Sequence, residues 1–538
     1  MQGTILTGGP IHTMANGPVE SVRVDGEKIT FTGELASAQA LGAAREVDLD
    51  GRCLMPGFVD AHTHPLMHGQ CMSWADLSSA NSVDDLIKTL REHQLGLKQD
   101  QPIRGFGYDQ HRLDEGRHPT AADLDRVSND REITIMHTSG HGYVANSVAL
   151  QTAGITAETP TPPGGLIERD DVGNPIGRVF DSACDLLTGS DGVKITNHGP
   201  NFHLPESEGE LLRMLDSAQD LFLAAGITSV GDCQVTEREM TTFLQARDAG
   251  RLRVRVTMYV LSSHVDAVRR LGLTSVLGDP WLSFGGIKHY ADGSLLSGTA
   301  YIPCGCGTTH GYLYHGTDEL EDLIATSNEL GLQTATHAQG PDAIQLVLDA
   351  LGRSEPRPDL RHRIEHCGFA TDEQLRLMNL LGVVPVPQPT QVFRYGDGVL
   401  RDHPELAPHM YSSGRFRDAG LEVVLSSDAP VTLPDVPLAC WSAETRLTSA
   451  GHVLGGDGRI TRSDAFRAYT VGGAHALRRD DVGALAHGMF ADLAILDRDP
   501  LAVPVNSLPD VRVDETWVNG RAAWTDGSGP INMTSDPY

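Results

Sequence analysis

Residues that can bind metal ions follow a short apolar stretch early in this sequence. The segment 56–65, PGFVDAHTHP, begins like a buried strand and contains Asp60, His62 and His64. In a β-strand, residues two positions apart face the same side, so these three side chains are predicted to point together. Two imidazoles on one face can hold a metal ion such as zinc. For an isolated His-x-His pair, however, the simpler interpretation is loop histidines with ordinary hydrogen bonds.

The pair is not isolated, because four more polar residues follow apolar or β-branched stretches in the same way. They are Lys288 in GGIKHYADG, His337 in TATHAQG, His366 in RIEHCG and Asp428 in LSSDAP. One buried polar residue at each strand end is costly unless the groups satisfy one another or bind a metal. A shared metal centre accounts for all of them together, and the sequence predicts one.

Such a centre requires a scaffold in which the ends of several strands meet. We expect strands at 57–64, 226–233, 253–260, 283–293, 332–340, 361–368, 382–389 and 421–430. Stretches between them, such as SEGELLRMLDSAQDLFLAAG and TDELEDLIATSNELG, place apolar residues three and four apart and predict helices. This alternation is typical of an α/β fold, the parallel (β/α)8 TIM-type barrel, whose active sites lie at the carboxyl ends of the strands.

The two ends of the chain and one long connection do not follow the barrel pattern. Residues 1–55 and 482–538 alternate apolar and polar positions around turns such as DGE and DGR, and together they are predicted to form a small β-sandwich domain. The barrel is predicted over residues 56–481. Its first two strands lie too far apart for a single crossover, so residues 70–205 are predicted to form an inserted subdomain after strand 1.

Composition narrows the expected partners and location. The 538 residues include 42 basic and 71 acidic side chains, a formal charge of −29, which disfavours nucleic acid and anionic membranes as partners. No apolar run approaches the roughly 18 residues needed to span a bilayer. The eight cysteines do not resemble a secreted disulfide framework, so a reducing, cytoplasmic location is expected. Cys304 and Cys306, in PCGCGTTHG, are interpreted as free loop thiols.

The same motifs, in this order, resemble those of the amidohydrolase superfamily. They are VDAHTHP, the lysine in IKHYADGS, THAQG, RIEHC and SSDAPV, followed by HGMFADLAILDRDP and ETWVNGRAAW. Within the superfamily, GYDQHRLDEGRHPTAADLD and SGHGYVANSVAL make the chain similar to amidohydrolase family 3, the branch that includes N-substituted formamide deformylase. The likeness extends along nearly the whole chain. It departs after His337, where AQGPDAI replaces the usual Gly-Asp-Arg at the mouth of the pocket.

The resemblance implies a divalent metal cofactor, most simply zinc, with one or two ions per chain. One ion would be bound by His62, His64 and Asp428, and a second by His337 and His366. Lys288 would be carboxylated by carbon dioxide and would bridge both ions. The alternative for Lys288 is an ion pair with Asp292 on the same strand face, and a single-metal site would then be expected.

The implied reaction is hydrolysis by activated water. Asp428 would take the proton of the attacking water and deliver it to the leaving nitrogen. His141, in SGHGY, would contact the substrate or its oxyanion, and Gln388, at the end of the seventh strand, would donate a hydrogen bond to the substrate. The simpler alternatives are a structural histidine and an ordinary hydrogen-bonding glutamine.

We therefore predict a metal-dependent hydrolase of C–N bonds other than peptide bonds, acting on a small amide that is best represented by an N-formyl or N-acyl compound. One alternative is a deaminase of a cyclic amidine on the same fold, which is disfavoured because LQTATHAQG lacks the glutamate expected of such enzymes. Another is a non-catalytic, regulatory relative, which the complete set of predicted ligands disfavours. A homodimer is the expectation from the resemblance.

Overall fold

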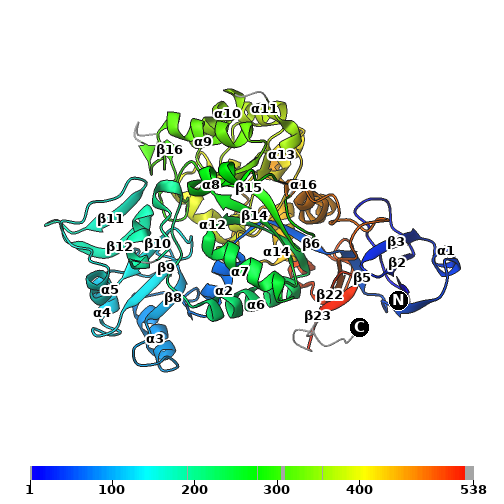
Figure 1. The fold of residues 1–538 in the computed structure, drawn as a ribbon, viewed down its shortest axis with the longest axis horizontal. Coiled ribbons are helices and arrows are strands. Elements are labelled where there is room, and N and C mark those ends of the chain that lie inside the picture. The colour runs from blue at the N-terminus through cyan, green and yellow to red at the C-terminus, as the bar shows by residue number, and fades with distance from the viewer. Residues whose placement is uncertain (1–2, 191, 276, 304–308, 354–355, 528–538) are drawn as a thin grey trace.

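The centre of the computed structural model is a parallel sheet of seven strands, curved into a nearly closed barrel (Figure 1). The structure describes residues 3–190, 192–275, 277–303, 309–353 and 356–527. The strands, in their order across the sheet, are β6 (Phe58–Thr63), β13 (Ile227–Val235), β14 (Arg255–Leu261), β15 (Leu282–Tyr290), β18 (Gln333–Ala338), β19 (Arg363–His366) and β20 (Val384–Val386). Each lies within or beside a stretch predicted as a strand, and the sheet is compatible with a TIM-type barrel.

The eighth predicted strand, 421–430, is wrong as a regular strand, because these residues form an irregular segment. Backbone hydrogen bonds nevertheless join the segment to both neighbours. Ser426 N donates to Pro387 O over 3.2 Å on one side, and Asp428 N donates to His62 O over 2.8 Å on the other. The segment therefore fills the gap between β20 and β6 without forming a continuous ladder.

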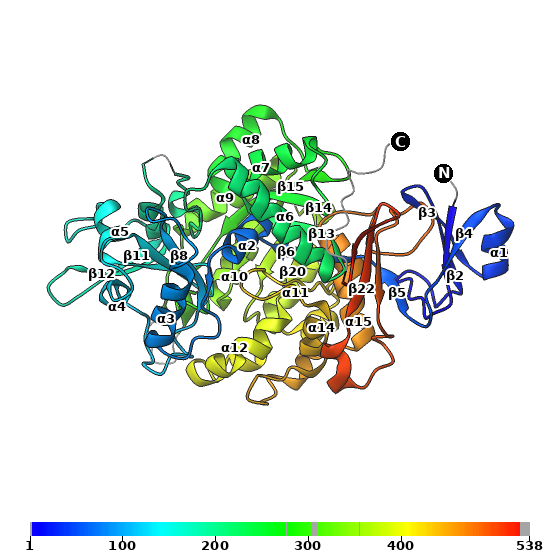
Figure 2. The ribbon, with the colours of Figure 1, turned by 90° about the horizontal axis from the view of Figure 1, so that it is seen from below.

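Helices follow the barrel strands and cover the outside of the sheet (Figure 2). They are α2 (Pro65–Met72), α6 (Glu208–Ala224), α7 (Glu237–Asp248), α8 (Val265–Leu271), α9 (Thr317–Glu329), α10 (Pro341–Arg353), α11 (Asp372–Leu381), α12 (Pro389–Asp402), α13 (Ser413–Asp418), α14 (Val436–Thr445), α15 (Arg462–Arg467) and α16 (Gly473–Ala476). Helix α6 begins at a capping box formed by Ser207 and Glu210, and its buried stripe includes Leu211, Leu215 and Phe222. Both predicted helical stretches are thus confirmed.

The insertion after β6 has a sheet of its own, which lies beside the barrel (Figures 1 and 2). Its strand order is β11-β12-β10-β9-β8-β7. The elements are β7 (Ala75–Asp76), α3 (Val83–Gln94), β8 (Ile103–Tyr108), α4 (Ala121–Asp125), β9 (Ile133–His137), β10 (Gly142–Ala145), α5 (Ser147–Thr152), β11 (Gly165–Arg169) and β12 (Pro175–Asp181). After β15, the short strands β16 (Ile302–Pro303) and β17 (Thr309–His310) form a hairpin.

Residues from both ends of the chain form two four-stranded sheets on the far side of the barrel from the insertion (Figures 1 and 2). One contains β1 (Gly3–Thr7), β2 (Ser21–Asp25), β3 (Lys28–Gly33) and β4 (Ala44–Asp48), with α1 (Leu35–Ala40) beside it. The other contains β5 (Cys53–Pro56), β21 (Leu493–Leu496), β22 (Val513–Val518) and β23 (Arg521–Thr525). Val22, Ile29, Leu493 and Trp517 belong to one apolar cluster that links the two sheets. The domain boundaries near residues 55 and 482 stay a prediction.

In the described part of the chain, no helix combines the length and apolar character needed to cross a bilayer. The predicted loop thiols, Cys304 and Cys306, lie outside the described residues.

Candidate metal centre

Three of the predicted ligands converge at the carboxyl end of β6. His62 is on β6 and His64 follows that strand directly, while the backbone bond from Asp428 N to His62 O places the carboxylate beside them. Asp428 Oδ1 lies 3.4 Å from His62 Nε2 and 3.4 Å from His64 Nε2. All three side chains are buried.

These separations fit atoms that bind the same metal ion better than atoms joined by a direct hydrogen bond. Hydrogen bonds between nitrogen and oxygen usually span about 2.7–3.2 Å. Two ligand atoms bound at about 2.0–2.1 Å to one tetrahedral ion stand roughly 3.4 Å apart. The ligand atoms of His62, His64 and Asp428 thus surround a space suited to a divalent cation.

His337 and His366, the predicted ligands of a second ion, lie next to this group. The ring centroids of His366 and His62 are 4.9 Å apart, and those of His366 and His337 are 4.4 Å apart. Burial lowers the pKa of His366 to about 3 and the pKa of His337 well below its usual value, so both rings are neutral and have a lone pair available for a metal. The backbones of His366 (φ +67°) and Asp428 (φ +59°) are left-handed, a strained conformation that concentrates at functional sites.

Lys288 is buried in β15, and among the described residues its Nζ has no hydrogen-bond partner. Its Nζ stands 4.6 Å from the centroid of the Tyr290 ring. Burial lowers the pKa of this amine, against the opposing effect of nearby anionic groups such as Glu365 and Asp428. An ion pair with Asp292, the alternative considered from the sequence, is not formed, because backbone N–H groups of Gln339, Gly340 and Tyr301 occupy the Asp292 carboxylate.

The charge around His62 also fits a bound cation. Burial by itself lowers the pKa of His62, yet the neighbouring Cys233 and Glu365 raise it well above its usual value. Asp428 shows the complementary effect: burial raises its pKa, but the nearby imidazoles of His62 and His64 hold the pKa well below the usual range. The site therefore concentrates negative charge, and its imidazole and carboxylate donors suit a divalent transition metal.

Glu365 was missed in the sequence, although it holds His62 in place. His62 Nδ1 donates to Glu365 Oε2, and Arg363 binds the same carboxylate through Nε at 2.7 Å and Nη2 at 2.8 Å. A carboxylate behind a metal-binding histidine fixes the tautomer that presents the other ring nitrogen to the ion. The signal available was the pair Arg363 and Glu365, two charged residues in a short buried strand. Asp232, whose Oδ1 lies 3.7 Å from His64 Nδ1, was missed as well.

A cavity of about 30 Å³ opens over these ligands. From the barrel it is lined by His62, His64, Tyr290, His337, His366 and Asp428, and from the insertion by Ser139, Gly140, His141, Pro200 and Phe202. Among the described lining residues there is no lysine or arginine. His141, predicted as a substrate contact, is thus placed at the cavity.

Gln388 is placed differently from the prediction of a substrate contact. It does not line the cavity. Its Oε1 accepts from His366 Nδ1 over 2.7 Å, while its Nε2 donates to Val386 O over 2.8 Å and to Ser426 Oγ over 3.0 Å. With both ends of the amide engaged, Gln388 orients His366 from behind.

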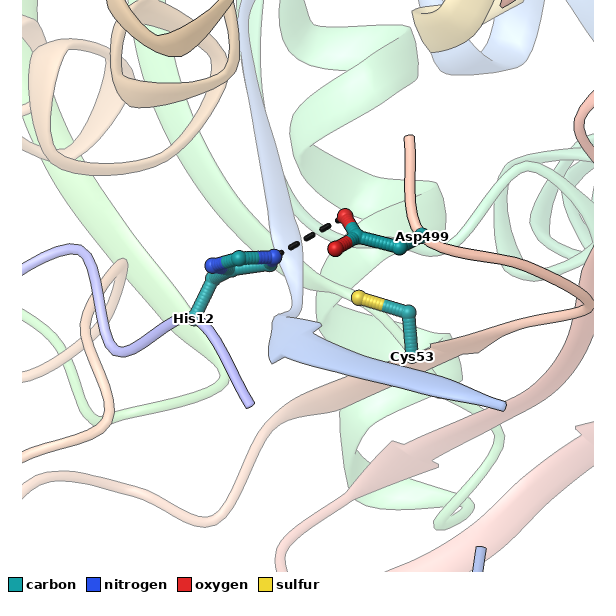
Figure 3. A group of neighbouring side chains, drawn as sticks. All are labelled: His12, Cys53 and Asp499. Carbon is teal, nitrogen blue, oxygen red and sulfur yellow. Dashed lines mark hydrogen bonds and ion pairs between the residues drawn. The ribbon is translucent and has the colours of Figure 1, made fainter. Parts of the chain in front are cut away.

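A separate group of possible ligands brings together residues from the N-terminal and C-terminal segments of the chain (Figure 3). It consists of His12, Cys53 and Asp499. His12 Nε2 stands 2.9 Å from Asp499 Oδ1, which is the length of an ordinary hydrogen bond. Burial raises the pKa of the Cys53 thiol above its usual value, which keeps it protonated. These contacts account for the group as a polar link between the termini.

The fold and this centre together define a barrel protein with a candidate divalent-metal site. The sequence pattern of the amidohydrolase family matches residues 45–523, and the chain belongs to that family. The chain is 30% identical to N-substituted formamide deformylase of Arthrobacter pascens, over 94% of this chain and 95% of that protein.

Two further comparisons extend this result. A crystal structure of an uncharacterized metal-dependent hydrolase from Pyrococcus horikoshii OT3 matches 94% of this chain and 99% of that one, with a TM-score of 0.76 and 25% identity. The exoenzymes regulatory protein AepA of Pectobacterium carotovorum subsp. carotovorum is 27% identical over 65% of this chain and 76% of that protein.

Proposed function

We propose that this protein is a metal-dependent hydrolase that cleaves the amide C–N bond of small, uncharged molecules, with N-substituted formamides as the first candidates. The observation that carries the proposal is the pair of 3.4 Å separations between Asp428 and the two β6-end histidines, beside two more neutral histidines. This arrangement of donors is not expected in a barrel whose interior serves stability alone, because buried imidazole and carboxylate groups cost free energy without a partner.

The ligands divide into two sets. His62, His64 and Asp428 would hold one divalent ion, and His337 and His366 a second, with carboxylated Lys288 as the bridge. A divalent cation bound there would supply a water of lowered pKa and polarise the carbonyl oxygen of the substrate. Zinc suits this set of nitrogen and oxygen donors.

Asp428 is the residue that moves the proton. Its carboxylate borders the cavity and has its pKa held low, so it is ionised and able to accept a proton from the attacking water. Gln391 Nε2 donates to its second oxygen, Oδ2, over 3.2 Å and thereby orients the carboxylate. Delivery of that proton to the nitrogen as the C–N bond breaks releases a neutral amine.

The lining of the cavity supports an uncharged substrate. A substrate carboxylate or phosphate is usually matched by arginine or lysine, and neither occurs among the described lining residues. Met67, Phe202 and Val431 offer apolar surface for a substituent on nitrogen. The named relative, N-substituted formamide deformylase, points to the same class of compound.

The decisive experiment combines metal analysis with a substrate panel. The purified protein is stripped with a chelator, reloaded with zinc, and assayed for amine release from N-formyl, N-acyl and cyclic amides. We expect one or two ions per chain, with two ions if Lys288 is carboxylated, and amine release that disappears on chelation and returns with metal. Metal binding without turnover of any amide would contradict the proposal.

A regulatory role is the second candidate, because one relative is named a regulatory protein. It predicts a chain that takes up no metal after supplementation and releases no amine. The same metal analysis therefore separates the two proposals.

A further inference from the structure

A buried hydrogen-bond network outside the metal ligands ends at His141. Asp181, the last residue of β12, is fully buried, and its Oδ1 lies 2.6 Å from His141 Nδ1. Tyr314 donates its hydroxyl to the same oxygen over 2.5 Å, and Tyr312 donates to Oδ2. The network thus joins the insertion to the segment that follows β17.

The network determines which ring nitrogen of His141 carries a hydrogen. The Asp181 carboxylate accepts from the hydroxyls of Tyr312 and Tyr314, so it is also the acceptor toward His141, and Nδ1 of His141 carries the hydrogen that it donates to Asp181. Burial and the Asp181 charge raise the pKa of both Tyr312 and Tyr314, which keeps their hydroxyls protonated as donors. Nε2 is then the ring nitrogen that can accept a hydrogen bond.

The ring of His141 lies next to the predicted metal ligands. The residue lines the cavity, and its ring centroid lies 5.5 Å from that of His337. Among the described residues none forms a hydrogen bond with Nε2. The backbone of Asp181 is left-handed (φ +52°), and its N–H donates to His141 O over 2.7 Å, so the two residues are held together through main chain and side chain. A strained backbone persists where the surrounding structure holds it.

We infer that His141 Nε2 accepts the N–H of a secondary amide substrate, and that Asp181 is the residue that positions His141 for this contact. The inference rests on the proposed function. It narrows the substrate class to amides with one hydrogen on nitrogen, such as R–NH–CHO. Tertiary amides lack that hydrogen and would leave Nε2 without a partner, which is the condition under which a site rejects an analogue strongly.

The test compares two substrates and four proteins. N-benzylformamide and N-benzyl-N-methylformamide are assayed with the zinc-loaded wild type, Asp181→Asn, His141→Ala and the double variant. In the wild type we expect kcat/KM to favour the secondary amide by about 10²-fold or more. Both single variants should lose most of this preference. Asp181→Asn leaves the His141 imidazole in place, so a loss in that variant does not come from added room in the cavity.

The double variant separates positioning from general structural support. If Asp181 acts through His141, its replacement has no further effect on kcat/KM once His141 is alanine. An equal loss in both backgrounds, or a preference unchanged in Asp181→Asn, would overturn the inference. Asp170→Asn, in the turn between β11 and β12 where Asp170 Oδ1 accepts from Asn174 N over 2.7 Å, is the matched control and should behave as wild type.

Two further measurements cover the remaining outcomes. If Asp181→Asn does not fold, Tyr314→Phe removes one donor to the carboxylate and should lower the preference about tenfold. If the wild type releases amine from no amide of the panel, these two formamides included, the proposed function fails, and a crystal structure of Asp181→Asn decides the positioning claim independently. A His141 ring turned away from the cavity would support it, and an unmoved ring would overturn it.

Discussion

The ligands of the candidate centre are held by a set of residues that do not line the cavity. Glu365 holds His62 through Nδ1, Gln388 holds His366 through Nδ1, and Asp292 fixes the loop after β18 by accepting from Gln339 and Gly340. Each ring therefore presents a defined nitrogen to the site. The reactivity of the centre depends on this support as much as on the ligands, because a ligand free to rotate loses affinity for the ion.

Asp428→Asn tests the proton-transfer role directly. Asparagine keeps the size and one oxygen ligand but cannot take a proton, so we expect kcat to fall by about 10²–10⁴-fold. The measurement is amine release by the zinc-loaded variant, together with its metal content. Asp418→Asn, at an exposed site in α13, should remain within twofold of wild type. Near-full activity of Asp428→Asn would remove Asp428 from the mechanism.

Glu365→Gln tests the residue behind His62. The substitution replaces the carboxylate acceptor of His62 Nδ1 and breaks the charge pair with Arg363, so zinc affinity should fall by about 10–100-fold. Competition with a chelator of known affinity measures the change. Glu373→Gln, on the exposed side of α11, is the control. Equal zinc affinity in both variants would mean that Glu365 serves folding alone.

Among the elements, α2 is the one most directly tied to the metal centre. It begins immediately after His64, which caps its first turn through the bond from His68 N to His64 O over 2.8 Å. The helix packs closely on α6 at Gly69, where an added Cβ would meet Met214 O at 1.8 Å. The position of His64 is thus set partly by how closely these two helices approach.

Gly69→Ala is expected to push α2 away from α6, because the contact is with backbone that cannot rotate aside. We expect a loss of about 1–3 kcal/mol in stability and a lower zinc affinity. Thermal unfolding and chelator competition measure the two effects. In the matched variant Gly398→Ala, in α12, the new Cβ would meet only Arg401 Nη2 at 3.8 Å, so that variant should be unchanged or slightly more stable. The argument fails if both variants unfold at the wild-type temperature.

Across the whole molecule, a buried ion pair ties the barrel to the sheet made by β5 and β21–β23. Arg255, the first residue of β14, binds Asp492 through Nε at 2.7 Å and Nη2 at 3.0 Å, and Asn519 N donates to the same carboxylate over 3.0 Å. Both charged side chains are almost completely buried. This sheet is therefore attached to the barrel through buried polar contacts.

Arg255→Met would leave Asp492 buried without its counter-charge. We expect a destabilisation of about 3–5 kcal/mol, seen as a lower unfolding temperature. Arg247→Met, which breaks a half-exposed pair with Asp248 on α7, should change stability by no more than about 0.5 kcal/mol. The double variant Arg255→Met/Asp492→Leu should recover part of the loss. If Arg255→Met is as stable as wild type, the pair does not join the two parts of the molecule.

The sequence by itself located the seven regular strands of the barrel, the helices beside them and the six polar residues predicted as ligands. These features depend on local pattern: a buried parallel strand needs a short apolar run, a helix needs its 3.6-residue period, and a polar residue at the end of such a run is visible without knowing its partner. His62, His64, Lys288, His337, His366 and Asp428 could be read in this way.

The tertiary structure alone decided the partners. Glu365 meets His62 across 303 positions of sequence, and Asp181 meets His141 across 40, so no local pattern could pair them. Gln388 turned out to serve His366 because the fold places it behind that ring. The segment at 421–430 became irregular, since its hydrogen bonds are set by two neighbours that are themselves distant in sequence. Local pattern predicts which residues are suited to the chemistry, and long-range packing determines which atoms face one another.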